Sequence, residues 1–254
     1  MKHGICLQSM VALRKSPSEQ SGMINQLLFG DLFIVEQITD NWCFINTIDD
    51  AYPAWANISQ LHFLNDGEFE SINESPRFYS LNSSNISFSN DNKLVYTFGS
   101  RLPNFDSGVF SLEGSSYKHE GDVIEPSSGN RILEIAKLYL GSPYLWGGRS
   151  IFGIDSSGFV QMVFKLNGIL LPRDVSQQLK TGNTINFLEE AEAGDLAFFE
   201  NEEGDIVHVG ILMGNEGIIH SSGELRIDSI DHNGIFNKKL DKYTHKLRIL
   251  KRPA

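Results

Sequence analysis

The chain has 254 residues, of which 41% are hydrophobic, enough for two or three small domains with folded cores. Its 32 acidic and 21 basic side chains give a net charge of −11, which argues against nucleic acid or an anionic membrane as a partner, because both need clustered positive charge. Two cysteines cannot build a disulfide framework, and no apolar run approaches the roughly 20 residues that span a bilayer, so we expect neither disulfide staples nor membrane insertion.

Residues 1–64 predict a small all-β barrel. Short apolar runs at 27–28, 32–35 and 42–45 are separated by the turn-forming sequences SPS at 16–18, GD at 30–31 and DN at 40–41. Such closely spaced short strands suit a small barrel. The runs LRKSPSEQS, LLFGD, NWCFI and AYPAWANISQL make the segment resemble a bacterial SH3-like domain.

Residues 65–125 are less regular. The stretch SINESPRFYSLNSSNISFSNDN is dense in Ser and Asn, as loops are, whereas KLVYTFGSRL, GVFSLEG and SSYKHEGDVI alternate like strands. We predict a second, degenerate SH3-like barrel here. A long linker with a hairpin is the alternative.

Residues 126–254 predict an α+β domain. Apolar side chains at helical spacing indicate a first helix, capped by Ser127 or Ser128 and ended by Gly141 and Pro143. A second helix runs through SSGFVQMVFKLNG and a short third follows PRD, whereas DLAFFE, HVGILMG, GIIHSSG and LRIDSI are expected to be strands. Helices followed by a run of strands indicate helices packed on an antiparallel sheet.

Three separate segments of the sequence contain the residue types of a catalytic site. Residues 153–159 read GIDSSGF and open the second helix, and His208 and His220 follow on two successive predicted strands. These blocks resemble the NlpC-type cysteine peptidases, papain-like enzymes that act on bacterial cell-wall peptides. The resemblance implies a papain-like fold, a nucleophile at position 156, a general base at His208 and an orienting residue at His220. It implies no metal or organic cofactor.

The residue types fit this chemistry without the family. A thiol in the first turn of a helix meets unpaired N–H groups and the positive end of the helix dipole, which lower its pKa from about 8.5. A nearby imidazole can lower that pKa further, and a third group must fix the imidazole tautomer. Gly214 and Gly217 lie in the short interval between His208 and His220, which suits adjacent antiparallel strands with both rings on one side.

Position 156 departs from the pattern, because it holds Ser where the family has Cys. A hydroxyl is a far weaker acid than a thiol, so we predict that the chain as written is inactive or nearly so. Either an active cysteine peptidase was disabled by a cysteine-to-serine replacement, or a natural pseudo-peptidase retains only binding to muropeptides or cell wall. The intact surroundings of Ser156 favour the first explanation.

The combination with SH3-like domains resembles the γ-D-glutamyl-L-diamino-acid dipeptidyl-peptidases that recycle murein peptides. It implies a substrate such as L-Ala-γ-D-Glu-L-Lys, or its meso-diaminopimelate form, that is cut to release L-Ala-γ-D-Glu. It also implies residue roles: Tyr144 and Asp174 bind the free terminal amine, Asp155 and Ser157 line the substrate site, and Tyr52 limits the pocket to two residues.

Several of these residues also have structural interpretations. Asp155 and Asp174 can each cap a helix, since Asp is a favoured N-cap residue. Trp146 is expected to pack beneath the site, whereas Tyr144 is expected to face the cleft. Cys6 and Cys43 lack a basic helix-start setting, so we expect structural thiols.

A metal site built from His208, His220 and Asp205 is not expected, because no further carboxylate or Cys completes the ligand spacing. His245 belongs to no constellation in the sequence. If Met1 is the natural start, the protein is expected in the cytoplasm, because the N-terminus lacks an apolar leader with a cleavage site. If a leader was removed, the location is periplasmic or extracellular.

Overall fold

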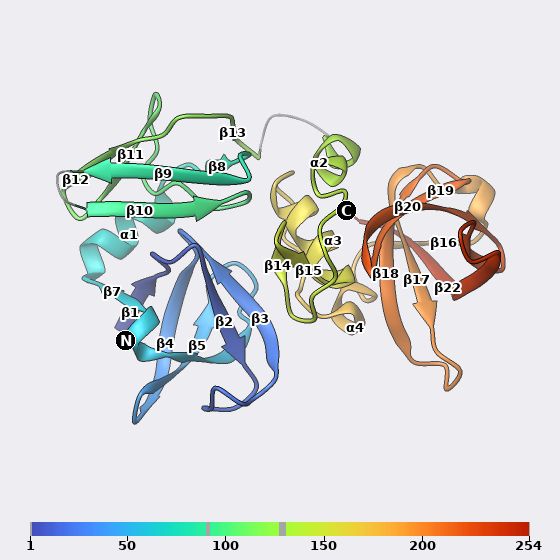
Figure 1. Cartoon of the computed structure of the whole chain (residues 1–254), viewed down its shortest axis with the longest axis horizontal. Coiled ribbons are helices and arrows are strands. Elements are labelled where there is room, and N and C mark those ends of the chain that lie inside the picture. The colour runs from blue at the N-terminus through green and yellow to red at the C-terminus, as the bar shows by residue number, and fades with distance from the viewer. Residues whose placement is uncertain (1, 90–91, 127–130, 254) are drawn as a thin grey trace. The chain divides into compact units, whose positions relative to one another are not determined.

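The structure is a computed structural model that describes residues 2–89, 92–126 and 131–253. It separates into two compact units (Figure 1). Unit 1 comprises residues 1–128 together with 146–151, and unit 2 comprises residues 129–145 together with 152–254. None of the helices in the described ranges is long and apolar enough to cross a membrane.

Unit 1 begins with a seven-stranded antiparallel sheet in the order β3-β2-β6-β5-β4-β1-β7. Alternating burial on strands such as β5 places one face of the sheet in a core that contains Cys6 and Cys43. Both cysteines are free and buried, as expected for structural thiols. The strands are β1 (Lys2–Ile5), β2 (Met10–Arg14), β3 (Met23–Leu28), β4 (Leu32–Thr39), β5 (Trp42–Thr47), β6 (Pro53–Asn57) and β7 (His62–Leu64), with the 3-10 turn η1 (Ile58–Gln60) before β7.

The rest of unit 1 shares a core with this first sheet. Leu32 of β4 and Phe29, in the turn after β3, pack in one cluster with Phe69, Tyr96 and Phe110. Three two-stranded antiparallel sheets and one helix make up this part. Whether it is a degenerate SH3-like barrel stays a prediction. Its elements are α1 (Asp66–Glu74), β8 (Tyr79–Ser80), β9 (Ser84–Ser89), β10 (Asn92–Thr97), β11 (Val109–Leu112), β12 (Ser115–Lys118) and β13 (Val123–Ile124).

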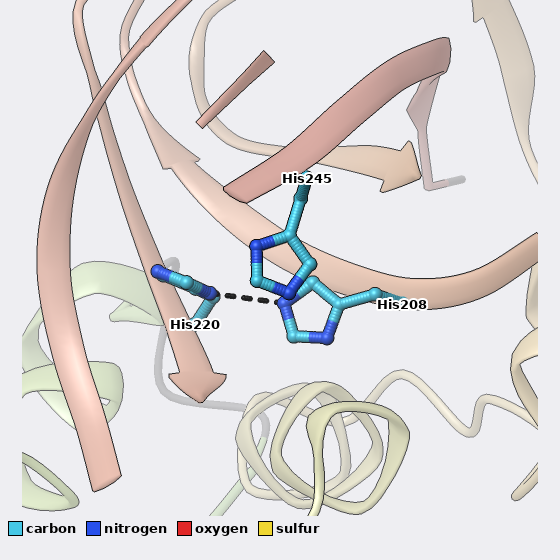
Figure 2. Close-up of side chains that lie close together, drawn as sticks. All are labelled: His208, His220 and His245. Atoms are coloured by element: carbon cyan, nitrogen blue, oxygen red, sulfur yellow. Dashed lines mark hydrogen bonds between the residues drawn. The ribbon is translucent and has the colours of Figure 1, made fainter. Parts of the chain in front are cut away.

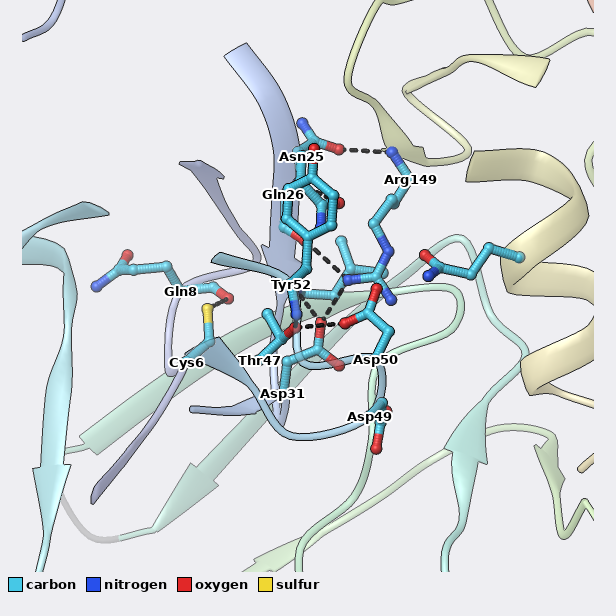
Figure 3. Close-up of polar contacts among 12 residues, drawn as sticks. Cys6, Gln8, Asn25, Gln26, Asp31, Thr47, Asp49, Asp50, Tyr52 and Arg149 are labelled. Atoms are coloured by element: carbon cyan, nitrogen blue, oxygen red, sulfur yellow. Dashed lines mark hydrogen bonds and ion pairs between the residues drawn. The ribbon is translucent and has the colours of Figure 1, made fainter. Parts of the chain in front are cut away.

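A short later segment, residues 146–151 with strand β14 (Arg149–Ser150), also belongs to unit 1. The Arg149 backbone N–H donates to Gln26 Oε1 at 2.8 Å, and its guanidinium donates to the Gln26 carbonyl at 2.8 Å and to Asp31 Oδ2 at 3.0 Å (Figure 3). Burial alone would lower the pKa of Arg149, but the carboxylates of Asp31, Asp50 and Asp49 raise it above its usual value. The arginine therefore stays charged in the interior of the unit.

Unit 2 contains three helices and an antiparallel sheet. In its described part, β22 pairs with β17 on one side and with β21 on the other, so the strands from β17 to β22 close into a barrel. The elements are α2 (Ile132–Leu138), β15 (Gly153–Ile154), α3 (Ser156–Lys165), α4 (Val175–Gln178), β16 (Asn183–Ile185), η2 (Leu188–Glu190), β17 (Ala193–Glu200), β18 (Ile206–Met213), β19 (Gly217–Ser222), β20 (Glu224–Asp231), β21 (Gly234–Asn237) and β22 (Lys242–Arg252).

The three predicted helices and the four predicted strands of unit 2 are present at the expected places. The sheet is larger than predicted, because β16, β21 and β22 join it, and closure by β22 makes it a barrel rather than an open layer. The predicted caps Ser127 and Ser128 lie outside the described residues. Gly141 follows the first helix with φ 84°, a left-handed conformation that suits a helix stop.

Candidate functional site

The start of α3 is shaped by Asp155. Its backbone is extended and its carboxylate accepts from the Gly158 backbone N–H at 2.7 Å, so it caps the helix as the sequence predicted. Ser156 is therefore the first residue of the helix, at the positive end of the helix dipole, and it is 7% exposed. All ten residues of α3 are buried, and the helix packs on β18 and β19.

His208 on β18 and His220 on β19 face each other across two antiparallel strands. His208 Nε2 lies 2.9 Å from His220 Nδ1, and both rings are buried (Figure 2). Gly210 makes this approach feasible. A Cβ at that position would lie 2.7 Å from Ile218 Cδ1 and 3.0 Å from His220 Cβ, so a side chain there would displace the ring.

Asp228 on β20 continues the chain of contacts. Its Oδ2 lies 3.1 Å from His220 Nε2, and its Oδ1 accepts from Arg226 at 2.8 Å. Burial would raise the pKa of the Asp228 carboxyl, but the hydrogen bonds from His220 and Arg226 lower it below its usual value. The carboxylate is therefore ionised at neutral pH and can only accept hydrogen bonds.

This carboxylate fixes the tautomers of both imidazoles. His220 must donate its Nε2 proton to Asp228, so in its neutral form its Nδ1 is an acceptor. His208 Nε2 then donates to His220 Nδ1, which leaves the lone pair of a neutral His208 on Nδ1. The pKa of His208 lies well below 6.5 because of burial and the neighbouring rings of His245 and His220, so the neutral form dominates at pH 7.

His245 on β22 completes a cluster of three imidazoles. Its ring stacks on His208 with a centroid distance of 4.2 Å and meets His220 edge-on at 5.4 Å (Figure 2). Burial and the His220 ring lower the pKa of His245 to about 4. One nitrogen from each ring of His208, His220 and His245 lies within 4.8 Å of the others.

The segment before α3 is tied to the strand that carries His220. Ser221 Oγ donates to the Ile154 carbonyl at 2.8 Å, two residues before Ser156. Together with the packing of α3 on β18 and β19, this bond sets the helix start against the histidine strands. The arrangement can support nucleophilic catalysis, since the helix that begins at Ser156 packs on the strand that carries the oriented base His208.

A buried arginine organises the first turn of α3. Arg173 donates to Asp155 Oδ2 at 2.6 Å and to Ser157 Oγ at 2.8 Å. Tyr144 is 41% exposed, and its pKa is raised by partial burial and by the Asp155 carboxylate. Asp174 occupies the N-cap position of α4, but its side chain makes no cap hydrogen bond.

The structure brings most predicted site residues into unit 2, on α3 or around the barrel strands. Tyr52 lies in unit 1, partly buried against the core of the first sheet, so its predicted role stays a prediction. The prediction for Trp146 is wrong, because its side chain is 67% exposed. The segment from residue 146 belongs to unit 1, which removes Trp146 from the core beneath α3.

Three residues were missed in the sequence. The grouping of His245 with the other histidines was not expected, because barrel closure by β22 brings it there from a distant position. Asp228 was missed although it follows His220 on the next strand at a spacing that could place both on one face. Arg173 was missed because its partner Asp155 precedes it by a helix and a loop.

Comparison with known proteins identifies two domains. Residues 141–245 match the model of the NlpC/P60 family, and residues 13–61 match that of the bacterial dipeptidyl-peptidase Sh3 domain. The chain therefore contains an NlpC/P60 domain and a bacterial dipeptidyl-peptidase SH3 domain, which confirms the two resemblances found in the sequence.

Similar proteins carry related names. The gamma-D-glutamyl-L-lysine dipeptidyl-peptidase of Bacillus subtilis is 38% identical over 125 aligned positions, and the alignment covers 46% of this chain and 42% of that protein. The enzyme of the same name from Bacillus cereus is 28% identical over 194 aligned positions, and the alignment covers 68% of this chain and 57% of that protein. This chain thus spans about half the length of these two relatives.

Two further similarities extend over nearly the whole chain. Dipeptidyl-peptidase 6 of Lysinibacillus sphaericus is 24% identical over 259 aligned positions, gaps included, and the alignment covers 90% of this chain and 92% of that protein. The crystal structure of an NlpC/P60 family protein from Bacillus cereus has a TM-score of 0.82 at 19% identity and covers 99% of each chain. The structural likeness shows a shared fold.

Proposed function

We propose, from an NlpC/P60 domain joined to a bacterial dipeptidyl-peptidase SH3 domain, that this chain has the architecture of a cell-wall peptide hydrolase. The reaction is acyl transfer at the bond between γ-D-Glu and the diamino acid, with release of L-Ala-γ-D-Glu. The observation that carries the proposal is the hydrogen-bonded series Asp228, His220 and His208, in which the two histidines lie on the strands that α3 packs against.

Each group has a role in this proposal. His208 Nδ1 takes the proton of the nucleophile at position 156 and later returns it to the leaving amine. His220 orients the His208 ring, and Asp228 is a positioning residue that acts through His220. The backbone N–H of residue 156, at the positive end of α3, contributes to binding of the oxyanion.

The residues around the first turn of α3 are proposed to bind the substrate. A free terminal ammonium needs an anionic or hydroxyl partner when it leaves water. We assign this role to Tyr144 and Asp174, with Asp155 and Ser157 shaping the floor of the site. The Arg173 bonds to Asp155 and Ser157 hold that floor in place.

Ser156 limits what this chain can do. His208 is neutral at pH 7 and its surroundings hold its pKa well below 6.5, so it is a weak base toward an alcohol. A thiol at the same place can ionise through the helix dipole and an ion pair with His208, which an alcohol cannot do to a useful extent. We therefore propose that the chain with Ser156 binds substrate but turns it over slowly or not at all.

The test is to replace Ser156→Cys and assay L-Ala-γ-D-Glu-L-Lys by mass spectrometry. We expect release of L-Ala-γ-D-Glu that is abolished by thiol alkylation, with little or no release by the Ser156 chain. The double variant Ser156→Cys, His208→Gln should be inactive, whereas Ser156→Cys, His232→Gln should keep its activity because His232 is exposed. Absence of thiol-dependent cleavage in a folded Ser156→Cys variant would refute the peptidase proposal.

Ser156 itself favours one second candidate, a non-catalytic module that binds muropeptides or cell wall. Calorimetry with L-Ala-γ-D-Glu-L-Lys and with its N-acetylated form separates the two. Recognition of the terminal amine predicts binding of the free peptide only. Equal binding of both peptides, or binding of wall polymer alone, would favour the module.

A further inference from the structure

The imidazoles of His208, His220 and His245 lie close together, with one nitrogen of each within 4.8 Å of the others (Figure 2). The role proposed above uses the first two rings and leaves the third without a function. His245 is not needed to orient His208, since His220 already binds its Nε2. The cluster therefore contains one imidazole, that of His245, which the proposed catalytic series does not require.

The donor atoms of the cluster can be assigned from its hydrogen bonds. Thr244 Oγ1 lies 2.9 Å from His245 Nδ1, so Nε2 is the nitrogen that His245 turns toward the other two rings. The facing atoms are then Nε2 of His208, Nδ1 of His220 and Nε2 of His245. Figure 2 shows this nitrogen of His245 beside the hydrogen-bonded nitrogen of His208.

The spacing of these atoms is close to that of a metal site. Zinc binds imidazole nitrogen at about 2.0–2.1 Å in a tetrahedral arrangement, which places ligand nitrogens about 3.3 Å apart. Here two of the nitrogens are 2.9 Å apart and all three lie within 4.8 Å. To aim all three nitrogens at one ion, the rings must rotate out of the His208–His220 hydrogen bond and the stacking of His208 on His245.

The surroundings have two further features of a metal site. A ligating histidine normally gives its other N–H to a carboxylate, and His220 does so to Asp228 at 3.1 Å. A pocket of about 840 Å³, lined by His245, Tyr243 and the acidic Glu200 and Glu202, reaches the third ring. It offers a cation a path to a cluster whose other two rings are buried.

We propose that His208, His220 and His245 bind one divalent transition-metal ion of the zinc class, with three imidazole ligands and an open fourth position. Imidazole donors suit zinc, copper, nickel and cobalt rather than magnesium or calcium. The site differs from the set of His208, His220 and Asp205, which was not expected to bind metal, because His245 takes the place of the carboxylate.

Metal binding has a consequence for His208. The ion takes the Nε2 lone pair, so the proton on Nε2 moves to Nδ1 and the ring stays neutral. Nδ1 is the atom that must accept a proton in catalysis, so the bound metal removes the base. This regulatory part rests on the proposed function, whereas metal binding itself does not.

Binding is tested on the full chain with Ser156, using Zn²⁺ in competition with a chromogenic chelator. We expect binding at one-to-one stoichiometry in the micromolar range or tighter. His245→Gln should weaken it at least about 10-fold, and Asp228→Asn should weaken it about 10-fold to 100-fold. The matched control His232→Gln should stay within about 2-fold, because that ring is exposed and outside the cluster.

A measurement without substitution guards against misfolded variants. Addition of Zn²⁺ should shift the imidazole ¹⁵N resonances of His208, His220 and His245 and spare His232. Failure to bind zinc, shifts confined to other histidines, or unchanged affinity in folded His245→Gln would each overturn the metal site.

The regulatory part is tested in the active background. Zinc should inhibit the Ser156→Cys variant, and adding His245→Gln should relieve the inhibition, measured in each variant as the ratio of cleavage rates with and without zinc. Equal inhibition with and without His245 would mean that zinc inhibits by binding the thiolate at position 156. That result would overturn the regulatory part. If Ser156→Cys proves inactive, the proposed function fails, but the zinc isotherm of the Ser156 chain still decides the metal site.

Discussion

At the scale of single residues, Asp228 determines where the protons of the site lie. It is buried and ionised, it accepts from His220, and it thereby leaves the lone pair of His208 on Nδ1. A change at Asp228 alone would therefore disturb the protonation of His208, even if every residue that contacts the substrate stayed the same. The Asp228 carboxylate fixes the tautomer of His220, and His220 in turn fixes the tautomer of His208.

Replacing Asp228→Asn in the Ser156→Cys background should reduce kcat by about 10-fold to 100-fold, because an amide can donate as well as accept and no longer enforces one tautomer. The ring ¹⁵N shifts of His220 should change together with the pH profile. Asp241→Asn, at an exposed position in the same unit, is the matched control. Unchanged kcat and unchanged His220 shifts would contradict the relay.

The buried imidazoles also make stability depend on pH. The folded-state pKa of His245 is about 4, because of burial and the His220 ring, against about 6.5 in an unfolded chain. The folded state binds fewer protons, so stability is complete above about pH 6.5 and declines as pH falls toward 4.

Between about pH 7.5 and about pH 5, His245 alone should account for a loss of about 2 kcal/mol in the free energy of unfolding. Urea unfolding of the unmodified chain and of His245→Gln at both pH values measures this loss. We expect a smaller decline in the variant, with His232→Gln behaving like the unmodified chain. Equal declines in all three would show that His245 is not held neutral.

At the scale of elements, the start of α3 depends on a partner from a later loop. The Asp155 cap orients the first turn, and Arg173, which is almost fully buried, compensates the charge of that cap. A buried ion pair adds little net stability compared with apolar packing, but removal of one partner leaves an unpaired buried charge. The position of Ser156 therefore depends on Arg173.

Arg173→Met should lower the free energy of unfolding by about 3–5 kcal/mol. Arg131→Met is the matched control, since Arg131 pairs with Glu134 at the surface of the same unit and should cost at most about 1 kcal/mol. Urea denaturation followed by circular dichroism compares the two. Similar costs for both variants would mean that Arg173 does not hold the cap.

At the scale of the whole molecule, the chain returns from unit 2 to complete unit 1. Residues 146–151 lie between segments of unit 2, yet Arg149 pairs with Asp31 in the interior of unit 1. Asp31 also accepts from the Leu28 backbone N–H at 2.9 Å, so it supports the turn after β3. A chain cut at the apparent boundary near residue 126 would leave unit 1 without this arginine.

Arg149→Met should reduce hydrogen-exchange protection of unit 1 by the equivalent of about 3–5 kcal/mol, because the buried Asp31 carboxylate loses the positive charge that compensates it. Adding Asp31→Asn should recover part of the loss by removing that charge. Arg77→Met, which breaks a more exposed pair with Asp49 in the same unit, should have a much smaller effect. No rescue by Asp31→Asn would argue against the buried pair as the cause.

The local elements and the approach of His208 to His220 could be predicted from the sequence, because their signals are local. GIDSSGF contains both the cap Asp155 and the helix that follows, and alternating apolar residues define the strands that carry His208 and His220. Their spacing on successive strands was enough to predict that the two rings meet, and the 2.9 Å contact agrees with that prediction. The two domain resemblances rest on similarly contiguous motifs.

Only the tertiary structure placed the groups that complete the site. His245 joins the histidines because β22 closes the barrel, and closure is a property of pairing between strands far apart in the chain. Arg149 enters unit 1, and Trp146 becomes exposed, because a loop crosses from one unit to the other. The sequence by itself determined the elements and the chemistry of the residues at the α3 start and on β18 and β19. Long-range pairing decided which charges and rings surround them, because such pairing depends on the closure of loops and strands that no local pattern encodes.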